Sequence, residues 1–168
     1  DVLFVVVDPL RSGDEMHYHP GEVNMRMADV IIINKENSAH PAQIAATVKN
    51  VKHYNPRAKI IHADSVLSTD SKINLRGKRV IVVEDGPTVT HGGMPYGAGS
   101  VFAKAKGAVI VDPKPFAIGS IARAYLKYHQ LQDVIPALGY SKDQISELES
   151  TLKKADVDAI VSGTPIDL

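Results

Sequence analysis

The chain has 168 residues, which is enough for one domain with a sizeable hydrophobic core. Its 19 basic and 19 acidic residues give a formal net charge of zero, so charge predicts neither nucleic acid nor a membrane as a partner. The absence of cysteine excludes disulfides and thiolate metal sites, and no apolar run approaches the roughly 20 residues that span a bilayer, so we expect a cytoplasmic protein.

Short apolar runs alternate with helical patterns along the whole chain. We predict strands at 2–7, 29–34, 59–63, 80–83, 109–111 and 158–161. We predict helices at 24–28, 41–54, 99–106 and 118–129, and another that begins after the N-cap residue Ser141. This alternation indicates an α/β fold, with a three-layer, mostly parallel sheet and helices on both faces, of the P-loop NTPase or Rossmann-like class.

Both ends of the sequence lie close to strand-like runs. We therefore interpret residues 1–168 as a single α/β domain, the C-terminal fragment of a longer polypeptide. No G-x-x-x-x-G-K-[ST] motif is present, since Ala98 stands where the lysine must follow the Gly92 to Gly97 spacing. We expect that motif upstream, and we expect the isolated fragment to hydrolyse a nucleoside triphosphate poorly.

Polar residues follow the predicted strands at their carboxyl ends, where open α/β sheets bind ligands. Asp8, Asn34, Asp64, Asp85 and Asp112 each lie at or just past such an end. We therefore expect the loops after these strands to share one edge of one sheet.

A long loop joins the strand at 80–83 to the helix at 99–106, and loops of about a dozen residues tend to be functional. Glycines let backbone N–H groups approach a ligand, and a helix N-terminus favours anions. We predict a phosphate site here, with a glycine-rich surface turn as the alternative. The candidates are Glu84, Asp85 and His91 for catalysis and Thr90, Gly92 and Gly93 for phosphate or substrate.

The first predicted strand ends at a second polar segment. In P-loop enzymes an acid at a strand tip holds Mg²⁺, which makes Asp8 a candidate, although a cap or turn residue is the alternative. The planar guanidinium of Arg11 suits phosphate, and His17 and His19 add hydrogen-bond donors or a proton shuttle. A metal pair of the two histidines and a solvated polar loop both stay open, and the metal ligands are unknown.

The sequence Asn34-Lys35-Glu36-Asn37 follows a buried strand and resembles the N-K-x-D base-reading motif of GTP-binding proteins. Asn37 replaces the aspartate of that motif, and an amide that both donates and accepts fits adenine as well as guanine. Asp64 ends the next strand, where such proteins place a second base-contacting loop. We predict a site for GTP or ATP, with a polar loop as the alternative.

Lys114 lies between two prolines after the strand at 109–111 and is a further phosphate candidate. With these residues, the chain resembles the C-terminal part of the family of predicted GTPases related to cyclic 2,3-diphosphoglycerate synthetase. The resemblance rests on segments at 8–13 (DPLRSG), 18–22 (YHPGE), 27–35 (MADVIIINK), 82–88 (VVEDGPT), 90–93 (THGG), 112–113 (DP), 136–140 (PALGY) and 164–168 (TPIDL).

The resemblance implies a GTP- or ATP-dependent hydrolase or phosphotransferase that uses Mg²⁺. The synthetase of the family uses ATP to close an intramolecular phosphoanhydride in 2,3-diphosphoglycerate, and it releases ADP and phosphate. The implied partners are a nucleotide and a phosphorylated small molecule, and self-association into a homo-oligomer stays open. The alternatives are a non-catalytic regulatory domain for a nucleotide or phosphometabolite, and a structural domain.

Overall fold

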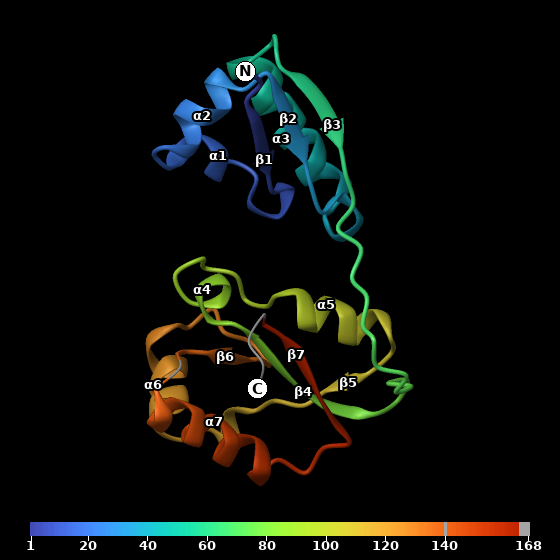
Figure 1. The fold of residues 1–168 in the computed structure, drawn as a ribbon, viewed down its shortest axis with the longest axis vertical. Coiled ribbons are helices and arrows are strands. Elements are labelled where there is room, and N and C mark those ends of the chain that lie inside the picture. The colour runs from blue at the N-terminus through green and yellow to red at the C-terminus, as the bar shows by residue number, and fades with distance from the viewer. Residues whose placement is uncertain (140, 165–168) are drawn as a thin grey trace. The chain divides into compact units, whose positions relative to one another are not determined.

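The computed structural model describes residues 1–139 and 141–164 (Figure 1). Tyr140 and the segment 165–168, which contribute to the family resemblance, lie outside the described residues. The contacts divide the chain into two compact units, which we call unit 1 (Asp1–Val66) and unit 2 (Leu67–Leu168). Each unit has its own sheet and its own core. That residues 1–168 act as a single domain stays a prediction.

Unit 1 contains a parallel sheet of three strands in the order β1-β2-β3. The strands are β1 (Phe4–Val7), β2 (Val30–Ile33) and β3 (Lys59–His62). Continuous apolar runs rich in β-branched residues form β1 and β2, as expected for parallel strands, whereas β3 has two isoleucines between Lys59 and His62. The three strands are in register, so their carboxyl ends lie at one edge.

The helices of unit 1 are α1 (Asp14–His17), α2 (Gly21–Met27) and α3 (Pro41–Tyr54), with 3₁₀ turns at Pro9–Arg11 and Glu36–Ser38. Their apolar side chains form one core with alternate residues of the strands. The buried members of this core are Val7, Met25, Ala28, Ile31, Ile33 and Val51.

Unit 2 is built around β4 (Arg79–Asp85), and all three neighbouring strands run parallel to it. These neighbours are β5 (Val109–Ile110), β6 (Ile135–Ala137) and β7 (Ala159–Gly163). The helices are α4 (Gly86–Val89), α5 (Ala98–Ala105), α6 (Gly119–Lys127) and α7 (Lys142–Lys154), with a 3₁₀ turn at Lys114–Phe116.

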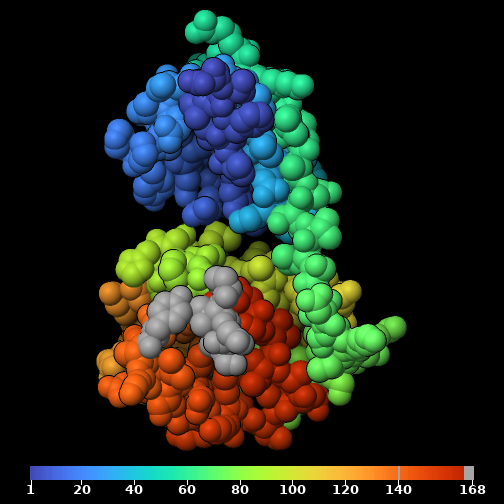
Figure 2. Space-filling model, in the orientation of Figure 1, coloured from blue at the N-terminus to red at the C-terminus, as the bar shows by residue number. Residues whose placement is uncertain are grey.

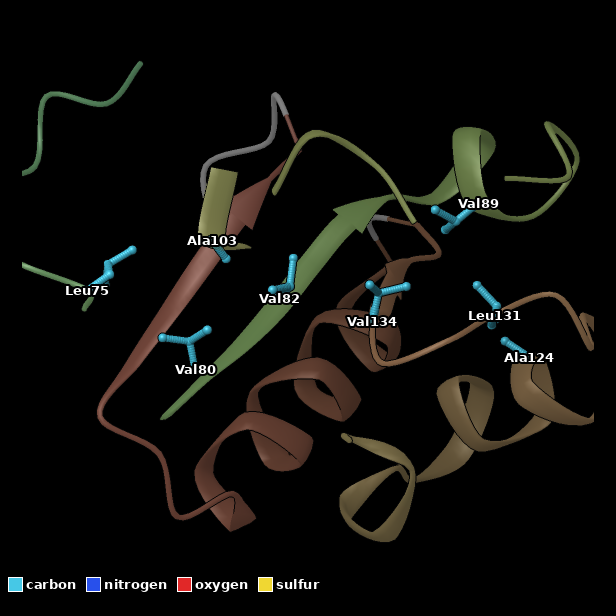
Figure 3. Close-up of a cluster of buried hydrophobic side chains, with 8 residues drawn as sticks. All are labelled: Leu75, Val80, Val82, Val89, Ala103, Ala124, Leu131 and Val134. Atoms are coloured by element: carbon cyan, nitrogen blue, oxygen red, sulfur yellow. The ribbon is translucent and has the colours of Figure 1, made fainter. Parts of the chain in front are cut away.

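Helices cover both faces of the sheet in unit 2. Val80 and Val82 pack in one cluster with Ala103 of α5, as Figure 3 shows. Ile81 and Val83 belong to a separate cluster, to which α6 and α7 contribute apolar side chains. The structure therefore confirms the α/β class with parallel sheets flanked by helices.

The expectation of one sheet edge shared by five strand ends is wrong, because the strands form two sheets. Asp8, Asn34 and Asp64 follow strands of the first sheet, whereas Asp85 ends a strand of the second sheet and Asp112 follows another. Parallel neighbours within one sheet need a crossover connection, usually a helix. The segment 63–78 between β3 and β4 contains no helix, and β4 starts a new sheet. Among the described residues, no helix has the length and apolar character needed to cross a membrane.

Candidate functional site

The carboxyl edge of the sheet in unit 1 gathers several of the predicted site residues. Val7, Ile33 and His62 occupy the same row of the sheet, each near the end of its strand. Asp8 follows the first of these residues and Asn34 the second, so the register brings their backbones together at this edge. Ligands of parallel α/β sheets bind at this kind of edge.

A direct ion pair joins two of the predicted residues at this edge. The ammonium group of Lys35 donates to Oδ2 of Asp8 at 2.7 Å, and Oδ1 of the same carboxylate accepts from the backbone N–H of Leu10 at 3.0 Å. Lys35 has a φ of 62°. No other non-glycine residue in the described part of the chain has a positive φ. This left-handed conformation costs a side chain with a Cβ roughly 1–2 kcal/mol, and such strain clusters at functional sites.

Asn37 connects the loop after β2 to the loop after β3. Its side-chain amide donates to the carbonyl of Ser65 at 3.1 Å, and its Oδ1 accepts from the N–H of Ser65 at 3.1 Å. Both polar atoms of the predicted base-reading amide therefore bind the main chain. An aspartate at this position lacks the donor that the Ser65 carbonyl uses.

A second contact, between His62 and Glu36, joins the ends of the same two strands. Neither residue was predicted from the sequence as part of the site. Nδ1 of His62 lies 2.5 Å from Oε1 of Glu36, with the ring N–H as donor and the carboxylate as acceptor. Glu36 follows β2 and His62 ends β3. The signal in the sequence was the position of both residues at the ends of neighbouring parallel strands.

Most of the other predicted residues of unit 1 have side chains without a polar partner in the described part of the chain. Within the described part of the chain, the side chains of Arg11, His19, Asn34 and Asp64 make no hydrogen bond or ion pair, and all but Asn34 are exposed. His17 differs, because its Nδ1 lies 2.7 Å from a main-chain carbonyl oxygen four residues earlier. The free side chains of Asn34 and Asp64, which follow β2 and β3, give this edge the capacity to bind a polar ligand.

Asp8 meets the minimum requirement for Mg²⁺ bound together with a nucleotide. Such an ion usually takes one or two carboxylates and completes its shell with phosphate oxygens and waters. Among the described residues, no group of three or more His, Asp or Glu side chains is placed to hold a metal ion. Asp8 therefore fits as a single carboxylate ligand, on condition that Lys35 releases Oδ2.

A buried carboxylate lies one residue before the end of the strand β4 in unit 2. Glu84 is 1% exposed and accepts hydrogen bonds from Gly99 N at 3.1 Å, Ser100 N at 2.7 Å and Ser100 Oγ at 2.8 Å. These donors belong to the first turn of α5, where we predicted phosphate. An anion does lie at this helix end, as the macrodipole favours, but it is the carboxylate of the chain itself. Glu84 thus positions the loop that precedes α5.

The glycines near Glu84 are explained by close packing within unit 2. A Cβ added to Gly97 or to Gly163 would lie 2.5 Å from Oε2 of Glu84, and one added to Gly99 would lie 2.8 Å from Val82 Cγ1. Gly93 is different, since it has a φ of 67° and open space around the position of a Cβ. Of these four glycines, only Gly93 has the freedom that a phosphate-binding loop requires.

Asp85 and Thr90 hold the two ends of α4. Oδ2 of Asp85 accepts from the N–H of Thr88 at 3.3 Å and from its hydroxyl at 2.9 Å, as an N-cap residue does. The hydroxyl of Thr90 donates to the carbonyl of Gly86 at 2.7 Å. Both predicted site residues therefore have structural contacts that fix the loop next to His91.

The hydrogen bonds around His91 favour one tautomer. Because Thr90 uses its single O–H for a carbonyl, its oxygen can only accept from Nδ1–H of His91, which lies 3.2 Å away. The lone pair of Nε2 then accepts a long hydrogen bond from the hydroxyl of Tyr128, which lies 3.5 Å away. The His91 side chain is exposed, so a ligand that replaces the Tyr128 hydroxyl can reach Nε2.

Lys114 already has anionic neighbours in unit 2. Its ammonium group lies 3.7 Å from Asp112 Oδ1 and 4.0 Å from Asp133 Oδ1, and 5.7 Å from the centre of the Tyr125 ring. Burial, and secondarily the charges of Asp112 and Asp133, raise the pKa of Tyr125 above its ordinary value. A phosphate bound by Lys114 has to compete with both carboxylates.

Unit 2 also has two pockets that are not lined by the predicted site residues. They have volumes of about 310 and 410 Å³ and lie against the extended segment 67–75, where Ser68, Thr69 and Ser71 provide hydroxyl groups. Residues of α5 line both pockets, and the whole of β7 lines the smaller one.

Comparison with known proteins gives the class of enzyme to which the sequence is related. No protein-family model matches the sequence. The chain is 52% identical, over 169 residues, to a protein of Thermococcus kodakarensis named arginine synthetase ArcE. This chain is homologous to part of a protein that is named a synthetase. The similarity covers the whole chain but only 38% of the length of that relative. It agrees with the synthetase character implied by the family resemblance, whereas the link to cyclic 2,3-diphosphoglycerate synthetase stays a prediction.

Proposed function

We propose that these residues form part of a nucleotide-dependent synthetase and that the carboxyl edge of the sheet in unit 1 is its nucleotide subsite. The nucleotide is GTP or ATP with Mg²⁺. The observation that supports this most strongly is the strained Lys35, whose ammonium group lies 2.7 Å from Asp8 at the edge where α/β sheets bind ligands.

The Asp8–Lys35 pair supplies one group of each charge for a metal nucleotide. Asp8 would hold Mg²⁺, which neutralises phosphate charge when bound. Lys35, released from Asp8, would bind a phosphate oxygen or lay its stem on the base. Arg11 is exposed and unpaired in the described part of the chain, and its planar guanidinium suits a phosphate group.

The groups available for base recognition at this edge are Asn34 and Asp64. The amide of Asn34 both donates and accepts, which suits the edge of adenine, and the carboxylate of Asp64 accepts two N–H groups, which suits guanine. Asn37 acts indirectly in this proposal, since its amide is bound to the main chain of Ser65. It holds the two base-contacting loops at a fixed separation.

We also propose the product of the reaction that the whole protein catalyses. The 52% identical relative is named for arginine, and we extend that product to this protein. A phosphorylated small molecule is the second candidate, favoured by the segments of the family resemblance such as DPLRSG at 8–13. In both cases His91 is the proposed proton acceptor, because its side chain is exposed and Thr90 favours the tautomer with the lone pair on Nε2.

The proposal is tested by a thermal-shift assay of the complete protein. A ligand that binds only the native state raises the thermal midpoint. At a hundredfold excess over Kd, it adds about 2.7 kcal/mol to the free energy of unfolding. We expect a shift with ATP or GTP plus Mg²⁺, and a further shift with arginine, the proposed product.

Three other outcomes are distinguishable in the same experiment. A shift with 2,3-diphosphoglycerate instead of arginine selects the phosphorylated substrate. A shift with a nucleotide or phosphometabolite, without any turnover, selects a regulatory domain. No shift with any ligand contradicts the proposed nucleotide subsite.

A further inference from the structure

The sheet of unit 1 has one covered face and one uncovered face. Side chains alternate along parallel strands, so Val5, Val7, Ile31 and Ile33 project to one side. All four belong to the core that includes residues of α2 and α3. This covered face is completed by Ile60 of β3.

The opposite face is formed by the alternate residues of the same strands. The register aligns Phe4 with Val30 and Lys59, and Val6 with Ile32 and Ile61. We call these six residues the open face, and Lys59 is its single polar member.

The apolar residues of the open face are exposed on the two outer strands and half-buried on the central strand β2. Phe4 is 57% exposed, Val6 62% and Ile61 37%, whereas Ile31 and Ile33 on the covered face are fully buried. Figure 2 shows the dark-blue residues at the start of the chain at the surface of unit 1. Contiguous exposed apolar surface of this kind marks an interaction site.

Unit 2 provides the comparison within the same chain. There, consecutive residues of β4 alternate between two apolar clusters, and both faces are buried. Sheets made only of parallel strands occur almost exclusively with helices on both faces. We therefore expect the missing cover of the open face to be a layer of helices and not a second sheet.

We propose that the open face binds an apolar face of one or more α-helices supplied by polypeptide outside residues 1–168 of the same protein. The relative that matches this whole chain provides the reason for this choice of partner, since the chain accounts for only 38% of its length. Such a protein has ample additional sequence for the missing layer. The proposal does not depend on the nucleotide or product of the reaction.

The absence of cysteine from residues 1–168 makes thiol labelling a direct test. In the complete protein, with any cysteine elsewhere replaced by serine, Val6→Cys places one thiol on the open face. Asp156→Cys is the matched control, because the Asp156 side chain is 98% exposed. We expect Val6→Cys in the native protein to react with a maleimide about tenfold or more slowly than the control, and at the same rate in urea. Equal native rates would overturn the proposal.

Cross-linking identifies what covers the thiol. A short thiol-to-amine cross-linker attached to the Val6→Cys variant should join lysines outside residues 1–168 of the same molecule. Cross-links confined to residues 67–168, or a cross-linked species of doubled mass, would overturn the proposal in favour of unit 2 or of a second copy.

A charge substitution gives an independent measurement. Val6→Asp should lower the thermal midpoint of the complete protein, because the carboxylate would be buried under the helical layer. Val66→Asp is the control, since Val66 is 84% exposed and lies outside the sheet. Equal midpoints for the two variants would contradict a covered face.

Discussion

At the scale of single residues, Lys35 connects backbone strain to the proposed ligand site. Its φ of 62° is unfavourable for any residue with a Cβ but not for glycine. We therefore predict that Lys35→Gly is more stable than Lys35→Ala by about 1 kcal/mol. Urea unfolding of the two variants measures this difference.

Lys49 provides the matched control for this prediction. It is exposed and lies inside α3, so glycine should be less stable than alanine there by about 1 kcal/mol. Opposite signs at the two positions are expected. The same sign at both would show that the left-handed conformation of Lys35 does not exist in solution.

A variant of Glu84 distinguishes a positioning role of this residue from a catalytic role. The buried carboxylate of Glu84 accepts three hydrogen bonds from the first turn of α5. Because an amide cannot accept all of these bonds equally, we predict that Glu84→Gln lowers the free energy of unfolding by about 2 kcal/mol. The exposed Glu149 is the control, and Glu149→Gln should change stability by less than about 0.5 kcal/mol. Lost activity at unchanged stability would instead assign Glu84 to the chemistry.

His91 is the proposed proton acceptor. We predict that His91→Ala lowers kcat of the complete protein by about 10²–10⁴-fold, the usual contribution of a general base. The thermal midpoint should change little, because the His91 side chain is exposed. His129→Ala, also at an exposed position, should leave both quantities unchanged. A parallel loss of stability and activity would remove His91 from the site.

At the scale of elements, helix starts were predictable and very short elements were not. Pro41 begins α3, and Ser141 with Gln144 forms the capping box predicted for α7, because these signals depend on adjacent residues. The strand β6 was missed, since it has three residues and contains Pro136. The helix α4 was missed because it occupies one turn inside the predicted loop.

The contact between α6 and α7 makes a prediction about pH. Glu147 of α7 accepts from the backbone N–H of Ser120 at 2.8 Å and from its hydroxyl, and these bonds hold the pKa of Glu147 below its ordinary value of 4.5. A lowered pKa in the folded state adds stability that is complete above pH 4.5 and is lost as pH falls through the folded value. Glu147→Gln should therefore be destabilising at pH 7.

The size of that effect should depend on pH. Urea unfolding at pH 7 and at pH 3 should show a difference between the parent protein and Glu147→Gln that shrinks at the lower pH. Glu149→Gln serves as a control on the same helix, since the Glu149 carboxylate has only Lys153 of α7 as a hydrogen-bond or ion-pair partner among the described residues. A difference that stays constant with pH would contradict the contact with Ser120.

At the scale of the whole molecule, the α/β class followed from the alternation of strands and helices, whereas the division into two sheets did not. Hydrophobic pattern specifies which residues are buried, but not which strands pair. The edge rule placed Asp8 and Asn34 together correctly, because both follow strands of one sheet. The Asp8–Lys35 pair required the actual register and backbone conformation at Lys35, which local pattern does not encode.

The central claim is that a nucleotide binds at the carboxyl edge of the sheet in unit 1. Isothermal titration of the complete protein with Mg-ATP and Mg-GTP, repeated for Lys35→Ala and for the control Lys49→Ala, tests it most directly. We predict that one nucleotide binds the parent and the control equally and binds Lys35→Ala about tenfold or more weakly, as expected for the loss of a charged contact. Equal affinity of all three proteins for both nucleotides would contradict the claim.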